Sequence, residues 1–194
     1  MRLSLLASLA ALSVVVACAA KEELVAKSAE IPAGVDLSGQ WRLRADSQQT
    51  VRRINDPEIA AAGGNERITV PPQRSSQKAR RRSTDGILVH VFLETGTALK
   101  VTQTDSGLFI SFDRAVVEEY RFGEKRQISV GPVLADRVSG WEGKAYIIET
   151  LDTDGAKLIE SYRLQDDGRS LVRTIAIIVK GEMPVDEAQV FDRA

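Results

Sequence analysis

Hydrophobic and polar residues alternate in short runs along the second half of the chain, and turn residues separate these runs. From residue 97 onward the turn signals include Asp105-Ser106-Gly107, Gly131-Pro132, Asp154-Gly155 and Asp167-Gly168. Short polar side chains and glycine at positive φ favour tight turns. Turns that recur about every 8–12 residues are typical of an all-β sandwich or barrel. The pattern therefore predicts an all-β fold, mainly an antiparallel meander.

The expected strands occupy the runs between these turns. They cover residues 98–104, 107–113, 117–122, 126–130, 134–140, 144–152, 156–164, 169–180 and 188–193. Residues 86–94 fit either an alternating strand or one face of a helix that stops at Gly96, and we favour a short helix that caps the barrel. Asp56-Pro57, followed by Ile59 to Ala62 and Gly63-Gly64, predicts another brief helix. We expect a barrel of about 8–10 strands with one or two short helices.

The first seventeen residues have the features of a secretion signal. Met1 and Arg2 form a short positive region, an apolar stretch follows over residues 3–16, and small residues precede Cys18. The alternative is an uncleaved transmembrane helix over residues 3–20. That stretch is at the short limit for crossing a bilayer and contains Ala and Ser where Leu and Ile would be expected. We therefore favour cleavage between Ala17 and Cys18.

The residues Val15-Val16-Ala17-Cys18 resemble the lipobox of bacterial lipoproteins. Cys18 is the only cysteine of the chain, so no intramolecular disulfide can form. The resemblance implies that the Cys18 sulfur takes a diacylglyceryl group, that the leader is cut after Ala17, and that the new amine is acylated. Ala19, in place of Asp, implies transfer to the outer membrane. The resemblance thus implies a lipid-anchored protein of the bacterial envelope, facing the periplasm, whose first partner is membrane lipid.

The remaining chain is long enough for one domain with its own core. Residues 18–35 are expected to form the lipidated N-terminus and a tether, because alternating charges and alanines precede the helix-breaking Ile31-Pro32-Ala33-Gly34. Residues 36–194 are expected to form the β-barrel domain, with a basic loop insertion at 46–84.

A Gly-x-Trp sequence at Gly39 and Trp41 stands immediately before the first expected strand. It resembles the first strand of lipocalin-type barrels, in which the glycine permits close packing and the tryptophan closes the base. In that family a basic residue of the last strand lies across the tryptophan, in a cation–π contact of about 1 kcal/mol. Arg193 or Arg173 would take this place. The resemblance implies a lipocalin-like architecture.

Charged side chains interrupt the apolar faces of three expected strands, at Glu149, Glu160 and Arg173. A two-residue turn at Asp154-Gly155 would set Glu149 directly opposite Glu160. A two-residue turn at Asp167-Gly168 would set Tyr162 opposite Arg173, diagonal to Glu160. If these faces point inward, the four side chains form the polar end of a ligand pocket. If they point outward, or if the cluster only stabilises the fold, they bind nothing.

Two facing carboxylates can also share a proton, which raises the pKa of one of them. The pair Glu149 and Glu160 therefore gives an alternative function, a hydrolase of envelope polymers. His90 is the only histidine, so no two-histidine metal site can form, and no Gly-x-Ser-x-Gly sequence supports a catalytic triad. We assign no catalytic residue, metal ligand or cofactor from the sequence.

A basic run lies within the expected loop insertion, at Lys78, Arg80, Arg81 and Arg82. Such a run is either a solvated loop or a contact with anionic lipid, worth about 1 kcal/mol for each well-placed charge. The formal net charge of −1 gives no global attraction to nucleic acid. The sequence therefore favours a non-catalytic binding or accessory module of the envelope, with a small apolar ligand or an envelope protein as partner. The alternatives are the hydrolase and a structural protein that docks to anionic lipid through residues 78–82.

Overall fold

The computed structural model describes residues 22–47, 87–165, 168–179 and 184–194. The two helices of this part are the 3-10 turn η1 (Ala45–Ser47) and α4 (Ile87–His90). Its strands are β1 (Gly39–Leu43), β2 (Ala98–Gln103), β3 (Gly107–Phe112), β4 (Val116–Arg121), β5 (Glu124–Val130), β6 (Val133–Glu142), β7 (Ala145–Asp152), β8 (Lys157–Leu164), β9 (Ser170–Ile178) and β10 (Val185–Arg193).

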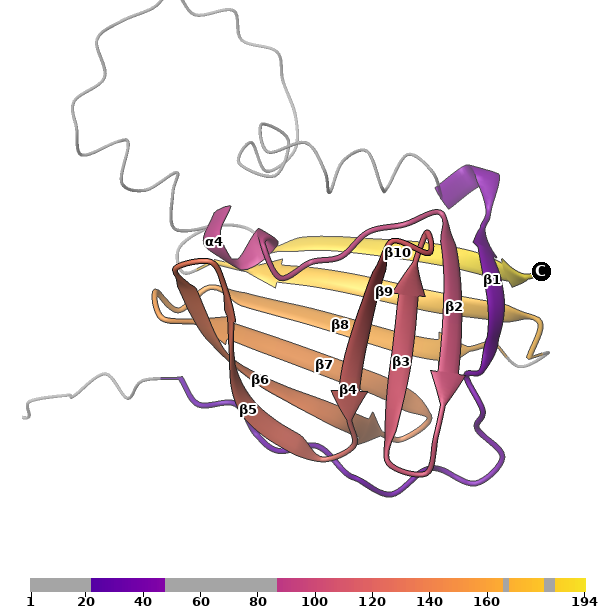
Figure 1. Ribbon diagram of the computed structural model, residues 1–194, viewed down its shortest axis with the longest axis horizontal. Helices are drawn as coiled ribbons and strands as arrows, with labels where there is room; N and C mark the ends of the chain where they lie inside the picture. The colour runs from indigo at the N-terminus through magenta and orange to yellow at the C-terminus, as the bar shows by residue number, and fades with distance from the viewer. Residues whose placement is uncertain (1–21, 48–86, 166–167, 180–183) are drawn as a thin grey trace, which may run out of the picture.

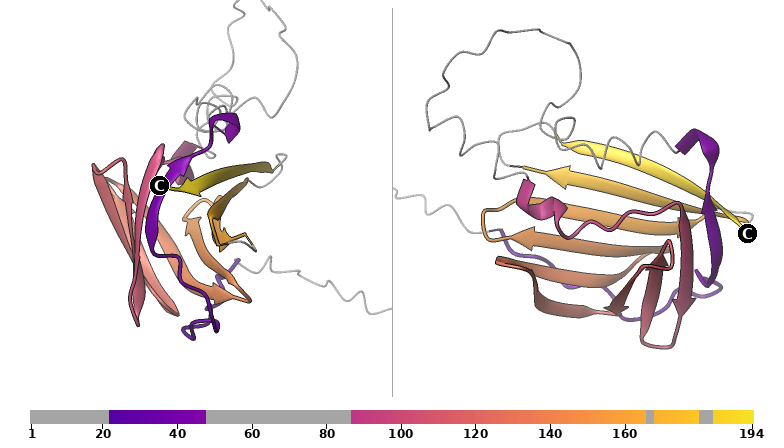
Figure 2. Two further views of the ribbon diagram at one scale, coloured as in Figure 1. Left: turned by 90° about the vertical axis from the view of Figure 1, so that its right-hand side faces the viewer. Right: turned by 45° about the horizontal axis from the view of Figure 1, so that its top comes forward.

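These strands form one antiparallel sheet that curls into a nearly closed barrel (Figures 1 and 2). The order is β4-β3-β2-β1-β10-β9-β8-β7-β6-β5, so every strand except at the β4–β5 step pairs with its neighbour in sequence, and β1 also pairs with β10. Hairpins therefore account for most pairings, and β1 brings distant segments together by pairing with both β2 and β10. The predicted all-β antiparallel meander is confirmed.

The barrel has one seam, between β4 and β5, where no strand pairing is formed. Side chains bridge it instead. Arg126 Nη2 donates to the Glu119 carbonyl at 3.0 Å, and Ser139 Oγ donates to the Arg121 carbonyl at 2.8 Å. These bonds satisfy backbone acceptors that an open sheet edge would leave unpaired.

The interior of the barrel is apolar at one end, where Trp41 and Leu37 pack. Alternate residues of β2 and β3 point inward, because successive side chains of a strand face opposite sides. Leu99 and Val101 of β2 and Leu108 and Ile110 of β3 are almost fully buried in this way. The cluster continues through Phe112, Tyr120, Phe122, Trp141, Tyr146, Ile148, Tyr162, Leu171 and Phe191.

Helix α4 covers the opposite end of the barrel (Figure 1). Val89 and Phe92 are buried there in a second cluster with Ala135, Ala156, Leu158, Ile175 and Ile177. A helix this short is not stable by itself, so its packing on the barrel must hold it. The predicted short capping helix is confirmed.

Residues 22–30 form a strap along the outer face of β6 and β7. The backbones of Ser28 and Trp141 exchange two hydrogen bonds, of 3.2 and 2.8 Å. Leu24 packs with Val138 and Leu151, whose side chains point away from the interior. The described part of the expected tether is therefore a component of the barrel wall and not a free spacer.

Ion pairs fasten the strap to the barrel. Lys27 Nζ lies 2.5 Å from Glu142 Oε1 and 2.7 Å from Glu149 Oε1. Burial disfavours the charged Lys27, but the two carboxylates outweigh burial and hold the pKa of Lys27 above its usual value. Lys157 Nζ lies 3.3 Å from Glu149 Oε2 and 3.2 Å from Glu22 Oε1.

Several expectations fall outside the described residues. They are the signal peptide, Ala17 and Cys18, the brief helix at 56–64, and the loop insertion apart from Asp46 and Ser47, with Lys78, Arg80, Arg81 and Arg82. Among the residues that are described, no helix has the length and apolar character needed to cross a membrane.

Candidate functional site

The predicted contact between Trp41 and the last strand is present, and Arg193 provides it. Trp41 pairs with Arg193 across β1 and β10, and the guanidinium lies 4.2 Å from the centre of the indole ring. Trp41 Nε1 donates to the Leu37 carbonyl at 3.1 Å, and Arg193 Nη1 donates to the Ser38 carbonyl at 2.9 Å. An added Cβ at Gly39 would lie 2.5 Å from Arg193 Nη1, so a larger residue there would displace the guanidinium.

A row of five paired side chains crosses the barrel wall. Gln189 of β10 pairs with Arg173, Arg173 with Tyr162, Tyr162 with Tyr146, and Tyr146 with Trp141. All five are buried, with exposures of 2% or less. The Arg173 guanidinium lies 5.2 Å from the ring centre of Phe112 on β3, across the barrel, so the row faces the interior.

Arg173 of this row forms a fully buried ion pair with Glu160. Three donors converge on Glu160 Oε2, namely Arg173 Nη2 at 2.5 Å, Arg173 Nε at 3.1 Å and the Tyr162 hydroxyl at 3.0 Å. Arg173 Nη2 also donates to the Glu94 carbonyl at 2.7 Å, and Nη1 donates to Gln189 Oε1 at 3.4 Å. The pair thus ties β8, β9 and β10 to the segment that follows α4.

Glu149 does not join this cluster, and its predicted position opposite Glu160 is wrong. In the structure Glu149 pairs with Ile159, while Glu160 pairs with Ile148. The loop between β7 and β8 holds one residue more than expected, because Asp152 N donates to the Ala156 carbonyl across Thr153, Asp154 and Gly155. A shift of one residue moves a side chain to the other face. Glu149 therefore faces the strap, and the two carboxylates cannot act as a catalytic pair.

A second arginine occupies the interior beside the first cluster. Arg137 of β6 is 5% exposed; its Nε donates to Thr150 Oγ1 at 3.0 Å and its Nη1 lies 3.4 Å from Glu118 Oε2. The guanidinium lies 5.5 Å from the ring centre of Tyr120 and 6.0 Å from that of Phe92. Because side chains alternate along β6, Arg137 lies on the same face as Ala135 and Trp141. This alternation is the sequence pattern from which its inward orientation could have been predicted.

Burial raises the pKa of three interior tyrosines, which are already neutral at physiological pH. Loss of solvation raises the pKa of Tyr120 and of Tyr162 well above the usual value. Burial also raises the pKa of Tyr146. Glu94 has a raised pKa as well, first from burial and then from the nearby Glu118 and Glu160 carboxylates. The interior therefore presents hydroxyl donors in their protonated form.

Three atoms of the interior row have no hydrogen-bond partner among the described residues. They are Gln189 Nε2, Trp141 Nε1 and the Tyr146 hydroxyl. Arg173 Nη1 donates to Gln189 Oε1, so the Gln189 amide is oriented with its oxygen toward Arg173 and its nitrogen away from it. An unsatisfied buried donor costs about 1–3 kcal/mol. Native proteins satisfy such groups with ordered water or a ligand.

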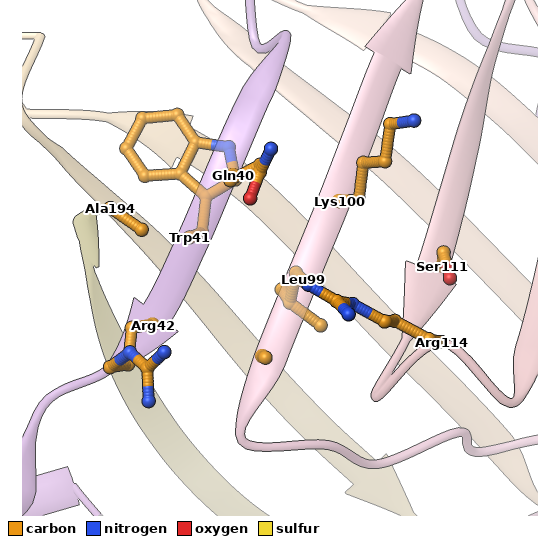
Figure 3. A pocket seen from close by; sticks show the side chains of 9 residues that line it. Gln40, Trp41, Arg42, Leu99, Lys100, Ser111, Arg114 and Ala194 are labelled. Carbon is orange, nitrogen blue, oxygen red and sulfur yellow. The ribbon is translucent and has the colours of Figure 1, made fainter.

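A separate pocket lies beside β1, β2 and β3, with a volume of about 360 Å³. Figure 3 shows the side chains of Arg42, Lys100 and Arg114 around it. All three are exposed, so water screens their charges. No group of three or more metal-ligating side chains occurs in the part of the chain that the structure covers.

His90 gives the capped end a measurable response to pH. Burial lowers its pKa below the usual 6.5, so the unfolded chain binds more protons below that pH. Its contribution to stability is complete above pH 6.5 and is lost as the pH falls through the lower folded-state pKa. Because His90 is the only histidine, its ring resonance can be followed alone by NMR. We expect a midpoint below 6.5 in the folded protein and a return toward 6.5 in urea; equal midpoints would contradict the burial of His90.

The chain matches no family model and no curated protein. It is similar to solved structures of low identity. Lipid binding protein 8 of Caenorhabditis elegans is 10% identical, with a TM-score of 0.45 over 84% of this chain and 100% of that one. A secretory abundant heat soluble protein of Ramazzottius varieornatus is 9% identical, with a TM-score of 0.48 over 85% and 100%. The REP1-NXSQ fatty acid transporter is 12% identical, with a TM-score of 0.46 over 82% and 96%.

Proposed function

We propose that this chain is a lipid-anchored, non-catalytic module of the bacterial envelope that binds a small apolar ligand inside its barrel. The observation that supports binding most directly is the interior row with three unpartnered polar atoms. Gln189 Nε2, Trp141 Nε1 and the Tyr146 hydroxyl lie in an interior that also holds the Glu160–Arg173 ion pair and the apolar cluster. An apolar ligand whose hydrogen-bond-accepting group reaches the Gln189 amide would satisfy that donor.

The anchor is the second part of the proposal and rests on the sequence. Acylation of Cys18 would hold the domain at the outer membrane, facing the periplasm. Several acyl chains together give a stable anchor, whereas a single chain binds reversibly.

The corrected ligand site consists of Glu160, Tyr162 and Arg173, with Gln189 added and Glu149 removed.

A native mass spectrum of the protein purified from its envelope tests the binding proposal. We expect a bound species that organic extraction releases and that the refolded chain takes up again. Gln189→Leu is expected to reduce its occupancy about tenfold, because one hydrogen bond to the ligand is lost. Gln127→Leu is the matched control, since Gln127 is exposed on β5. A protein that carries no small molecule and takes up no long-chain fatty acid in solution would rule out the binding function.

A further inference from the structure

Exposed large hydrophobic side chains gather at the end of the barrel that α4 covers. Val130 and Leu134 flank the turn between β5 and β6 and are 46% and 43% exposed. Val91 directly follows α4, and Ile178 ends β9; they are 39% and 40% exposed. Phe109 and Val117 are exposed elsewhere, on β3 and β4, and Val25 is exposed on the strap. An apolar group at one end of a barrel indicates contact with something other than water.

The hairpin between β5 and β6 is uncharged over its whole tip. Its sequence from Ser129 to Leu134 is Ser-Val-Gly-Pro-Val-Leu, and every residue except the partly buried Val133 is exposed. The hairpin between β6 and β7, at the opposite end, has Glu142 and Lys144 at its tip. The tips of these two hairpins therefore differ in charge, although the β7–β8 loop at the α4 end carries the exposed Asp154.

The strap fixes where the chain leaves the barrel. Glu22 is paired with Lys157 at the beginning of β8, and Glu23 with Lys125 of β5 at 2.6 Å. In Figure 1 the strap, drawn in indigo, begins at the end of the barrel where α4 lies. Three residues lie between Cys18 and Glu22, so an extended chain sets their Cα atoms at most about 14 Å apart.

From these observations we infer that the strap holds the α4 end of the barrel against the bilayer, with the tip of the β5–β6 hairpin within the lipid headgroup region. The inference rests on the proposed anchor at Cys18. Acyl chains in the bilayer, a short connection and a strap fixed to the wall leave the barrel little freedom to turn over. The uncharged hairpin is then at the depth where aliphatic side chains gain from burial.

This orientation also assigns the source of the ligand. The interior row is tied to the α4 end through the bond from Arg173 to the Glu94 carbonyl. With that end against the bilayer, an apolar ligand would move between membrane and barrel without crossing the periplasm. The surface thus fits a lipid bilayer, and its aliphatic side chains serve as a contact with the membrane in which the chain itself is anchored.

Depth-dependent quenching tests the orientation in the full lipidated protein. Pro132→Cys and Lys144→Cys place the same fluorescent label at the two opposite hairpins, and both positions are exposed. The lipidated proteins are reconstituted into phosphatidylethanolamine–phosphatidylglycerol vesicles that contain a lipid with a headgroup-level nitroxide. We expect the label at 132 to be quenched at least threefold more strongly than the label at 144. Equal quenching of the two labels would overturn the inference.

Two further measurements separate the orientation from the anchor. The mass of the mature N-terminus reports acylation of Cys18, so an unmodified chain would refute the anchor and the inference with it. An acylated chain with equal quenching would refute the orientation alone. Val130→Ser with Leu134→Ser should reduce quenching at 132 at least twofold while the vesicles still retain the protein. Unchanged quenching in this double variant would show that the hairpin does not enter the headgroup region.

Discussion

Arg173→Met is expected to lower the free energy of unfolding by about 3–5 kcal/mol, because it leaves the Glu160 carboxylate buried without a counter-charge. Glu160 is 1% exposed, and Arg173 supplies two of the three donors that converge on its Oε2. Removing Arg173 also frees the Glu94 carbonyl, so the segment after α4 loses its bond to β9. Urea unfolding followed by circular dichroism measures the change.

The double variant Glu160→Gln with Arg173→Met is the control for this result. Glutamine keeps an acceptor for the Tyr162 hydroxyl but carries no charge. Replacing both members of a buried pair is often close to neutral. We therefore expect the double variant to recover most of the lost stability. Two results would contradict this account of the Glu160–Arg173 ion pair. Either Arg173→Met alone lowers the free energy of unfolding by less than about 1 kcal/mol, or the double variant loses as much stability as the single one.

The strands could be predicted from the sequence because the residues of hairpin turns separate them. The turn at Asp167-Gly168 gave the β8–β9 register correctly, and Tyr162 lies opposite Arg173 as expected. The β7–β8 register was wrong by one residue. Asp152 accepts hydrogen bonds from the amides of Asp154 and Ala156, which stabilises a loop one residue longer than a tight two-residue turn.

Alternation could not correct that register, because both faces of β7 are covered. Ile148 faces the interior, whereas Ile147 and Leu151 face outward and are still only 8% and 4% exposed. The strap lies on this outer face, with Leu24 against Leu151. A strand that is buried on both sides gives no period of two.

The strap itself gave no sequence signal, since its charged residues are typical of a solvated segment. The contact that fixes it is made by backbone atoms, and its lysine is held by carboxylates from two strands. Gln189 was missed for a related reason, because an isolated polar residue in β10 does not reveal that its side chain is buried. Contacts between distant segments decided both cases.

Gly140→Ala is expected to detach the strap and to lower the free energy of unfolding by about 3 kcal/mol, the upper range for overpacking a filled site. A Cβ at Gly140 would lie 2.5 Å from the Ser28 carbonyl oxygen and 3.0 Å from the Gly123 amide nitrogen. Both are backbone atoms, so no side-chain rotation relieves the clash. The strap must move outward, and the hydrogen bonds between Ser28 and Trp141 are lost.

Hydrogen exchange at the Ser28 and Trp141 amides distinguishes this mechanism from general destabilisation. In Gly140→Ala the Ser28 and Trp141 amides should exchange at least tenfold faster. The amides of β8 and β9 should exchange faster only as far as the lower global stability requires. Gly143→Ala is the matched control: nothing lies within 4 Å of its added Cβ, and it incurs only the backbone strain of a φ of +56°. Faster exchange at Ser28 in Gly143→Ala, or full protection in Gly140→Ala, would show that close packing at Gly140 does not hold the strap.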